Sequence, residues 1–387
     1  MKIIKELEDL QPEMQNWRRD IHAHPEIAFE EHRTAKIVAD KLESFGIEVE
    51  TGIAGTGVVG TLKKGKGNRS IGLRADLDAL LIHETNDFEH KSQTPGKMHA
   101  CGHDGHTTML LGAAKHLTET RDFDGTAVLI FQPAEEGLGG ALEMIDHGLF
   151  DQFPCDEIYG MHNSPNGQPG KLDICKGTAM AGAAFFDIEI TGVGSHAAMP
   201  QNSKDTVVIA AALISQLQTI ISRNLPPLDT CVLSATQIHA GSAYNIVPET
   251  AKISGTIRYF KDEVLELTKR RMGEICRGLA EAYGVEIHLE TRNIFGVLEN
   301  DAELSDAYLD AATDILGPEN VSSNSVPATG SEDFAEMMKI VPGSYCRLGH
   351  TGTIGLHNPS FVLGQEILPL GASVLARVVE KRLPLSI

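Results

Sequence analysis

The sequence of 387 residues contains few aromatic residues and no long apolar run. Its densest apolar stretch, VVIAAALI at 207–214, is much shorter than the roughly 18 residues that cross a bilayer as a helix. The opening residues MKIIKELEDLQPEMQNW are charged and lack the apolar core of a secretory signal. We therefore expect a cytoplasmic protein with no membrane partner.

Positive charge is also scarce. Lysine and arginine number 33 against 53 aspartate and glutamate residues, which gives a formal net charge of −20. Nucleic-acid binding requires a basic surface that neutralises phosphates. The composition therefore argues against nucleic acid as a partner.

Closely spaced cysteine pairs are missing. The six cysteines are scattered and include no CxxC pair, which argues against a disulfide framework and favours reduced thiols. We expect most of them to be small buried apolar residues. They are Cys101, Cys155, Cys175, Cys231, Cys276 and Cys346, of which only Cys101 has strongly polar neighbours.

The first 180 residues alternate helical and strand-like patterns, which is typical of an open α/β sheet. In such sheets, ligands bind beyond the carboxyl ends of the strands. Three polar motifs, in LRADLD, IFQPAEE and IYGMHN, follow apolar strand patterns and fall at such ends. Helices are predicted at 2–23, 34–46, 106–119 and 140–150, and buried strands at 125–135 and 157–163.

The pattern changes between about residues 184 and 293. Strand, helix, strand, strand, helix and strand patterns follow one another within about 110 residues, which is the ferredoxin-like order βαββαβ. The α/β pattern then returns. The sequence therefore predicts a discontinuous α/β domain, residues 1–183 and 294–387, with a βαββαβ domain inserted at 184–293.

The densest polar motif is MHACGHDGHTT at 98–108. It could ligate a metal, hold a nucleophilic Cys101 beside His103, or form an ordinary polar loop. A structural zinc site would need a second close pair of ligands, and none has that spacing. A Cys–His catalytic couple usually comes from distant segments.

Three other strand or loop ends favour a metal. Glu135 and Glu136 follow an apolar strand, where two adjacent carboxylates are costly to bury unless a cation lies beside them. His162 follows another strand, and His357 lies in a Gly-rich stretch. Mixed N, O and S ligands of this kind suit a two-metal site, in which one glutamate ligates and its neighbour acts as general base. Asp76 or Asp78 could orient a ligating histidine.

Blocks along nearly the whole chain resemble the N-acyl-amino-acid amidohydrolases, which include hippurate hydrolase and plant auxin–amino acid hydrolases. This family belongs to the aminoacylase/carboxypeptidase group of dinuclear metallopeptidases. One departure is Leu81, where the family usually has proline. The blocks are RRDIHAHPEIAFEEHRTA, GLRADLDAL, MHACGHDGHTTMLLGAA, FQPAEEGLGGA, GMHN, GVGSHAAMP, AYNIVPE, GTIRYF, TGSEDFA and GLHNPSF.

The resemblance implies a role for each matching residue. Cys101 would bridge two divalent metal ions, zinc or manganese first, with cobalt or nickel possible. His103 and His162 would complete one ion, and Glu136 and His357 the other. Glu135 would be the general base. The family's fold implies a metallopeptidase-type catalytic domain with an inserted lid or dimerisation domain.

The inserted domain carries further candidates. The resemblance implies that His196 stabilises the oxyanion of the intermediate, in its own subunit or a neighbour's. Asn245 and Arg258, on the predicted paired strands, would bind the substrate's carboxylate. For His22, His24 and His106 we expect structural hydrogen bonds only.

The predicted activity is metal-dependent hydrolysis of N-acyl-L-amino acids, N-acetyl or aroyl, through a metal-activated water. The products would be a carboxylic acid and a free amino acid. A dipeptidase or carboxypeptidase using the same ions is the alternative enzyme. A metal-dependent binding or sensor protein, which could dispense with Glu135, is the alternative outside catalysis. The inserted domain, with its helices and an edge strand, would provide the contacts of a homodimer or higher oligomer.

Overall fold

The computed structural model describes residues 1–120, 122–165 and 167–385, which form two compact units. The large unit contains Met1–Ala179, Glu299–Val326 and the described residues from Asp333 onward. The inserted unit contains Met180–Leu298 and the short return segment Pro327–Glu332. The predicted fold class, an α/β unit interrupted by a second unit, is confirmed.

An eight-stranded mixed sheet forms the centre of the large unit, in the order β1-β2-β4-β3-β5-β16-β6-β15. β3 is parallel to β4 and β5, and β5 is parallel to β16, so the carboxyl ends of these four strands lie at one edge. The strands are β1 (Glu48–Ile53), β2 (Gly57–Lys64), β3 (Ser70–Asp76), β4 (Gly125–Gln132), β5 (Glu157–Ser164), β6 (Leu172–Asp173), β15 (Val321–Ser322) and β16 (Gly343–Gly349).

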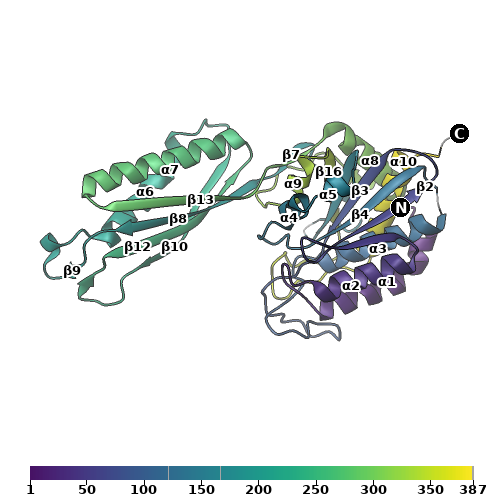
Figure 1. Cartoon of the computed structure of the whole chain (residues 1–387), viewed down its shortest axis with the longest axis horizontal. Coiled ribbons are helices and arrows are strands. Elements are labelled where there is room, and N and C mark those ends of the chain that lie inside the picture. Colours follow the sequence, from purple (N-terminus) through teal and green to yellow (C-terminus); the bar gives the residue numbers. More distant parts are fainter. Residues whose placement is uncertain (121, 166, 386–387) are drawn as a thin grey trace. The chain divides into compact units, whose positions relative to one another are not determined.

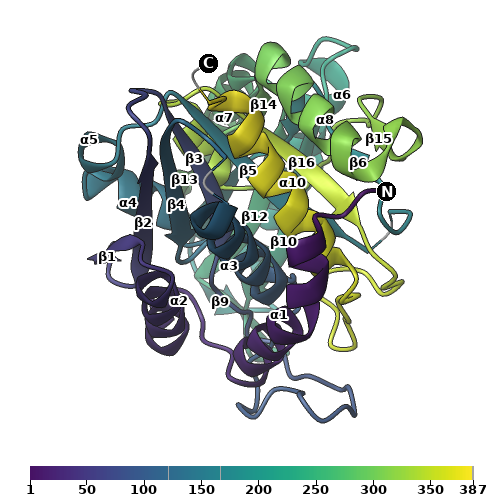
Figure 2. The same cartoon turned by 90° about the vertical axis from the view of Figure 1, so that its right-hand side faces the viewer.

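Helices cover this sheet, and Figure 2 shows α1, α3 and α10 side by side in front of it. Close approach of α3 and α10 depends on Gly371, because an added Cβ there would lie 2.0 Å from the sulfur of Met109. The helices are α1 (Lys5–Ala23), α2 (His32–Ser44), α3 (His103–Thr120), α4 (Gly140–Asp146), α5 (Leu149–Gln152), α8 (Ala302–Leu316), α9 (Phe334–Met338) and α10 (Ile367–Arg382).

Two predicted helices differ from the structure because of glycines with positive φ. Gly102, at φ 97°, ends the preceding loop, and α3 therefore begins at His103 rather than at His106. Gly148, at φ 81°, divides the predicted helix 140–150 into α4 and α5. The first difference matters for the site, because it places His103 in the first turn of a buried helix.

The inserted unit has a four-stranded antiparallel sheet in the order β10-β12-β8-β13, with α6 and α7 packed on it (Figure 1). This is the predicted βαββαβ arrangement. Alternate residues of β8, from Ala184 to Ile190, are buried and enter the core under the helices. The elements are β8 (Gly182–Thr191), α6 (Thr206–Arg223), β10 (Cys231–Ala240), β12 (Thr250–Tyr259), α7 (Asp262–Tyr283) and β13 (Glu286–Phe295).

One predicted strand of this unit is interrupted at Pro248. Proline has no amide hydrogen, and the chain forms the short β11 (Ile246–Val247) before it and β12 after it. β11 pairs with β9 (Ser195–His196) and not with the large sheet of the unit. The expectation that Asn245 and Arg258 lie on paired strands therefore holds for Arg258, on β12, which pairs with β10, and is wrong for Asn245, which precedes β11.

Helix α6 is long and apolar enough to cross a membrane by length and mean hydropathy, which is 1.4 over 18 residues. The sequence analysis expected no segment of this kind, and that expectation is wrong by these two criteria. Core helices of soluble proteins pass the same test, and Ile209, Leu213 and Leu217 of α6 are buried in the core of the inserted unit. The Asp205 carboxylate caps the helix by accepting the amide hydrogens of Val207 and Val208.

Candidate metal centre

The predicted ligands of the large unit converge at the carboxyl edge of its sheet. This follows from the parallel pairing of the strands that they extend. Asp78 follows β3, the two glutamates follow β4, His162 lies near the end of β5, and the loop after β16 supplies the last histidine. The residues brought together are Cys101, His103, Glu135, Glu136, His162 and His357.

Two groups of possible ligand atoms share the sulfur of Cys101. In one group, Cys101, His103 and His162 have ligand atoms within 4.8 Å of one another. In the other, Cys101, Glu136 and His357 do. The Sγ of Cys101 lies 3.4 Å from His162 Nε2, and His357 Nε2 lies 3.1 Å from Glu136 Oε1. This partition is the one that the family resemblance implied.

The histidine tautomers fit metal binding. His103 Nδ1 donates to the Asp78 carbonyl oxygen at 2.9 Å, and His162 Nδ1 donates to the Asn163 carbonyl oxygen at 2.7 Å. In its neutral form each ring therefore presents Nε2 as a lone pair. The buried Nε2 of His103 has no hydrogen-bond partner in the described part of the chain. An orphaned buried lone pair beside carboxylates and a thiol indicates a cation position.

The electrostatics of the centre also fit a cation. Burial raises the pKa of the Cys101 thiol, so a positive charge is required to hold it as a thiolate. Hydrogen bonds to Cys101 and Glu136 raise the pKa of His357 to about 10, because the protonated ring can donate to them, and a bound metal ion would take the place of this proton. Burial lowers the pKa of His162 well below its ordinary value, which keeps the ring neutral and able to ligate.

Glu135 is held by a strained turn. The preceding Ala134 has φ 55°, in the left-handed region that non-glycine residues rarely adopt. Its amide donates to Glu31 Oε1 at 2.9 Å, and Glu31 itself is buried and accepts from the Thr56 hydroxyl. Glu135 is 7% exposed, and its Oε2 lies 3.9 Å from His103 Nε2. Backbone strain of this kind persists where the surrounding contacts fix a functional side chain.

His357 occupies a second strained position, with φ 61°. Its amide donates to the carbonyl oxygen of Ala100 at 2.8 Å, which ties its loop to the residue before Cys101. This side chain is about half exposed, whereas His103 is fully buried. Leu81, the departure from the family pattern, points outward with 73% of its surface exposed.

Asp76, the last residue of β3, and Asp78 just after it have different partners. Asp78 accepts from His103 Nδ1 and, through Oδ2, from the Glu136 amide at 2.9 Å, so it orients two of the candidate ligands. Asp76 instead accepts from Nδ1 of His106 at 2.6 Å and pairs with Arg74. The charges of neighbouring histidines and Arg74 outweigh burial and lower the pKa of Asp76.

The histidines for which structural bonds were expected form them. His106 donates to Asp76 and accepts at Nε2 from the Asn163 amide. His22 lies between the carboxylates of Asp104 and Glu84, at 2.7 and 3.2 Å. His24 donates to a backbone oxygen of its own helix.

The remaining candidates lie in the inserted unit. His196 on β9 is exposed, and the Asn245 carbonyl oxygen accepts the amide hydrogen of Ala197 next to it. Arg258 lines a separate cavity of about 650 Å³ on the face of the sheet that also carries Phe185. The structure therefore brings His196 and Asn245 together and leaves Arg258 apart from them.

Sequence reasoning assigned no role to Asn163 or His350. Both are buried, and the Asn163 side chain donates to the Cys101 carbonyl oxygen at 2.6 Å and accepts from His350 Nε2 at 3.1 Å. A usable signal for Asn163 was its position directly after His162, where an apolar strand ends in two polar residues.

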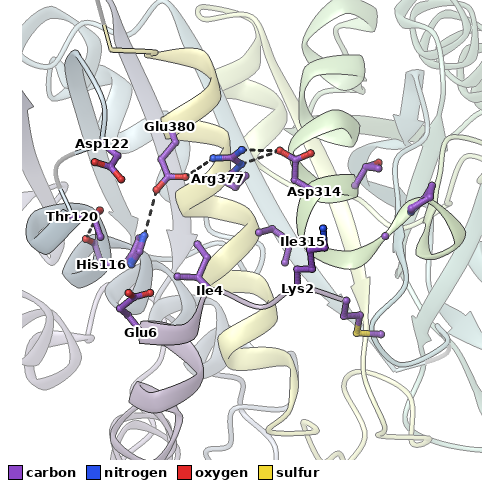
Figure 3. A pocket seen from close by; sticks show the side chains of 14 residues that line it. Lys2, Ile4, Glu6, His116, Thr120, Asp122, Asp314, Ile315, Arg377 and Glu380 are labelled. Carbon is purple, nitrogen blue, oxygen red and sulfur yellow. Dashed lines mark hydrogen bonds and ion pairs between the residues drawn. The ribbon is translucent and has the colours of Figure 1, made fainter.

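A cavity of about 700 Å³ in the large unit lies between α1, α3, α8 and α10 and contains none of the predicted site residues (Figure 3). Four of its polar side chains form one network. Arg377 binds Asp314 and Glu380, and His116 Nε2 lies 3.4 Å from Glu380. No comparable set of converging ligands lines this cavity among the described residues.

Comparison with known proteins identifies the family. The model of Peptidase family M20/M25/M40 matches residues 72–381. The chain belongs to this family. It is similar to the hippurate hydrolase of Campylobacter jejuni, with 42% identity over 99% of this chain and 100% of that enzyme's length. Thermostable carboxypeptidase 2 of Saccharolobus solfataricus is 35% identical over 96% of this chain and 97% of its own.

A solved structure of the M20 family supports the same conclusion for the fold and the centre. It is a Bacillus subtilis protein described as a dinuclear metal binding peptidase, with a TM-score of 0.83 and 31% identity over 97% of this chain and 99% of that one. The predicted family and hydrolase class are therefore confirmed. The large unit of this M20 chain has a donor set for two metal ions.

Proposed function

We propose that this chain hydrolyses the amide bond of N-acyl-L-amino acids, N-acetyl or aroyl, to a carboxylic acid and a free amino acid. The observation that carries the proposal is the sharing of Cys101 between two ligand groups, with Glu135 beside them in a strained turn. The 42% identity to a hippurate hydrolase supports the substrate class, because hippurate is an N-aroyl amino acid.

The residues of the centre fit two divalent ions. Cys101 would serve both, with His103 and His162 on one and Glu136 and His357 on the other. When bound, such ions polarise the acyl carbonyl and lower the pKa of water. Imidazole and thiolate ligands favour zinc, and manganese is the next choice, ahead of cobalt and nickel.

Glu135 would act as the general base. Its carboxylate would take a proton from the attacking water and deliver it to the departing amine nitrogen. Asp78 would fix the ring of His103 through Nδ1 and the backbone of Glu136. The tether of Ala134 to Glu31 would keep the Glu135 carboxylate in place during this transfer.

The inserted unit would contribute substrate contacts. His196 Nδ1 accepts the amide hydrogen of Ala198 at 3.1 Å, so Nε2 carries the hydrogen and could donate to the oxyanion. Arg258 forms no ion pair with a carboxylate of the described residues, and burial lowers its pKa. A partly buried guanidinium without a counterion suits a substrate carboxylate, whereas Asn245 lies beside His196 and apart from Arg258.

A substrate panel tests this proposal. The metal-reconstituted chain should hydrolyse N-acetyl and N-benzoyl amino acids with kcat/KM at least about tenfold above that for dipeptides of the same C-terminal residue. N-acyl amino acids whose carboxylate is amidated serve as matched controls and should be poor substrates. Preference for dipeptides would instead favour the dipeptidase or carboxypeptidase reading, which the identity to a carboxypeptidase keeps as the second candidate.

The proposal also covers the domain boundaries, the oligomeric state and the location of the protein in the cell. The proposed domains are 1–183, 184–293 and 294–387, and the compact inserted unit, Met180–Leu298 with Pro327–Glu332, extends a few residues beyond the second of them at both ends. The exposed apolar residues of the inserted unit, among them Tyr244 and Ile246, suit a homodimer or higher oligomer formed through that unit. Reduced cysteines and the absence of paired thiols among the described residues suit the cytoplasm.

A further inference from the structure

All four polar groups of Asn163 bind segments of the candidate metal centre. Its amide donates to His106 Nε2 at 3.0 Å, and its carbonyl oxygen accepts from the ring of His162. Its side-chain nitrogen donates to the Cys101 carbonyl oxygen at 2.6 Å and to His106 Nε2 at 3.1 Å. Its side-chain oxygen accepts from His350 Nε2 at 3.1 Å. A buried asparagine whose polar groups all form hydrogen bonds holds its partners in one arrangement.

The local sequence permits this close approach. Gly102, between Cys101 and His103, has φ 97°, and a Cβ built on it would lie 2.2 Å from the Asn163 side-chain nitrogen. Any other residue at this position would push Asn163 away from the Cys101 carbonyl oxygen. The backbone of the Cys101 segment is therefore shaped around the asparagine.

His350 extends these contacts to the loop that carries His357. Its Nδ1 accepts the amide hydrogens of Gly352 at 2.9 Å and Gly364 at 3.1 Å. These two residues lie on either side of His357 in the chain, so His350 fixes both stems of the loop. Asn163 thus connects the segment of Cys101 and His103 to the loop of His357 through a single residue.

We infer that Asn163 is a positioning residue that holds Cys101 and the His357 loop at the separation required for one thiolate to serve two ions. This inference rests on the proposed dinuclear centre. Asn163 itself ligates nothing. It acts by fixing the Cys101 backbone on one side and His350 on the other, so that binding at one ion position favours binding at the other.

Cobalt titration of the metal-free full-length chain tests this role. Asn163→Asp keeps the shape of the side chain but replaces its NH₂ donor with a carboxylate oxygen. This oxygen would face two other acceptors, the Cys101 carbonyl oxygen and His106 Nε2, and would be repelled by them. We expect the affinity for the weaker-bound cobalt to fall about 10- to 100-fold, and the thiolate-to-cobalt absorption band to shift or weaken. His350→Phe, which removes the bond from the other side, should give the same change.

Asn300→Asp is the matched control. Asn300 is also buried in the large unit, and its side chain donates to the carbonyl oxygens of Cys175 and Tyr345 and accepts from the Tyr345 amide. None of these bonds reaches a predicted ligand. This variant should lower the stability of the metal-free chain while leaving cobalt affinity and the absorption band unchanged.

The outcomes separate the two proposals. Wild-type chain that binds fewer than two cobalt ions overturns the dinuclear centre and, with it, the role of Asn163. A second outcome overturns only the role of Asn163. In it, the wild-type chain binds two ions, and the cobalt affinities of both Asn163→Asp and His350→Phe lie within threefold of the wild-type values. If only one of the two variants folds, the role of Asn163 is judged from the cobalt affinity of that variant by the same threefold criterion.

Discussion

The Sγ of Cys101 lies 3.4 Å from Nε2 of His162, although the two residues are 61 positions apart in the chain. Cys101 precedes a buried helix, and His162 lies near the end of a central strand. The same sulfur is shared with the group of Glu136 and His357. Four candidate ligands from separate segments, His103, His162, Glu136 and His357, surround this one sulfur, which favours a metal centre over a nucleophilic cysteine activated by a single histidine.

Glu135→Gln should abolish most of the hydrolysis without removing metal. The amide side chain keeps the size of the carboxylate but cannot accept a proton, and general-base catalysis contributes about 10²- to 10⁴-fold to the rate. Steady-state kinetics with N-benzoylglycine, together with metal analysis of the same sample, measures both quantities. Glu143→Gln, on the exposed face of α4, is the control and should retain full activity. Unchanged turnover in Glu135→Gln would exclude Glu135 as the base.

Arg258→Ala should raise KM more than it lowers kcat. Loss of charge-assisted hydrogen bonds to a substrate carboxylate should reduce kcat/KM by about 10- to 100-fold. Arg292→Ala is a stringent control, because Arg292 lines the same cavity but is already paired with Asp187 at 2.6 Å. Equal effects of the two substitutions would show that only the general charge of the cavity matters.

Glu84 should stabilise the fold in a pH-dependent way. Burial alone would raise the pKa of Glu84, but hydrogen bonds from His22, Asn86 and the Ser92 amide lower it from its ordinary 4.5 to about 2. A lowered carboxylate pKa in the folded state contributes stability that is present above about pH 4.5. That contribution is lost as the pH falls toward 2.

Urea unfolding of wild type and Glu84→Gln between pH 7 and pH 3 measures this contribution. The difference in unfolding free energy should be largest near neutral pH and shrink below about pH 4.5. Glu43→Gln, at an exposed position of α2, should change stability by less than about 0.5 kcal/mol throughout. If the difference in unfolding free energy between wild type and Glu84→Gln instead grows as the pH falls, the lowered pKa of Glu84 is contradicted.

Much of the metal centre could be predicted because it follows from strand ends. An apolar strand followed by Glu135 and Glu136, and another ending at His162, must bring their polar residues to one edge when the strands are parallel. The βαββαβ order of the inserted unit could also be predicted from the sequence, because helices and strands have different hydrophobic periods.

The rest depended on contacts that spacing does not encode. Asp76 and Asp78, at and just after the end of β3, were both candidates to orient a ligand, but only the three-dimensional position of α3 places Asp78 against the Nδ1 of His103. The helix start at His103 required the positive φ of Gly102. The bonds of Asn163 join segments near residues 101, 106 and 350, so no local pattern could reveal them.

Metal counting on wild type and Cys101→Ala tests the central claim most directly. After reconstitution with zinc and removal of excess metal, the wild-type chain should retain about two ions, and Cys101→Ala should retain at most about one, because each group loses a shared ligand. Cys276→Ala, a buried cysteine in the inserted unit, should retain the wild-type content. A wild-type content of one ion or fewer, or two ions retained by Cys101→Ala, would contradict a centre built on a shared thiolate.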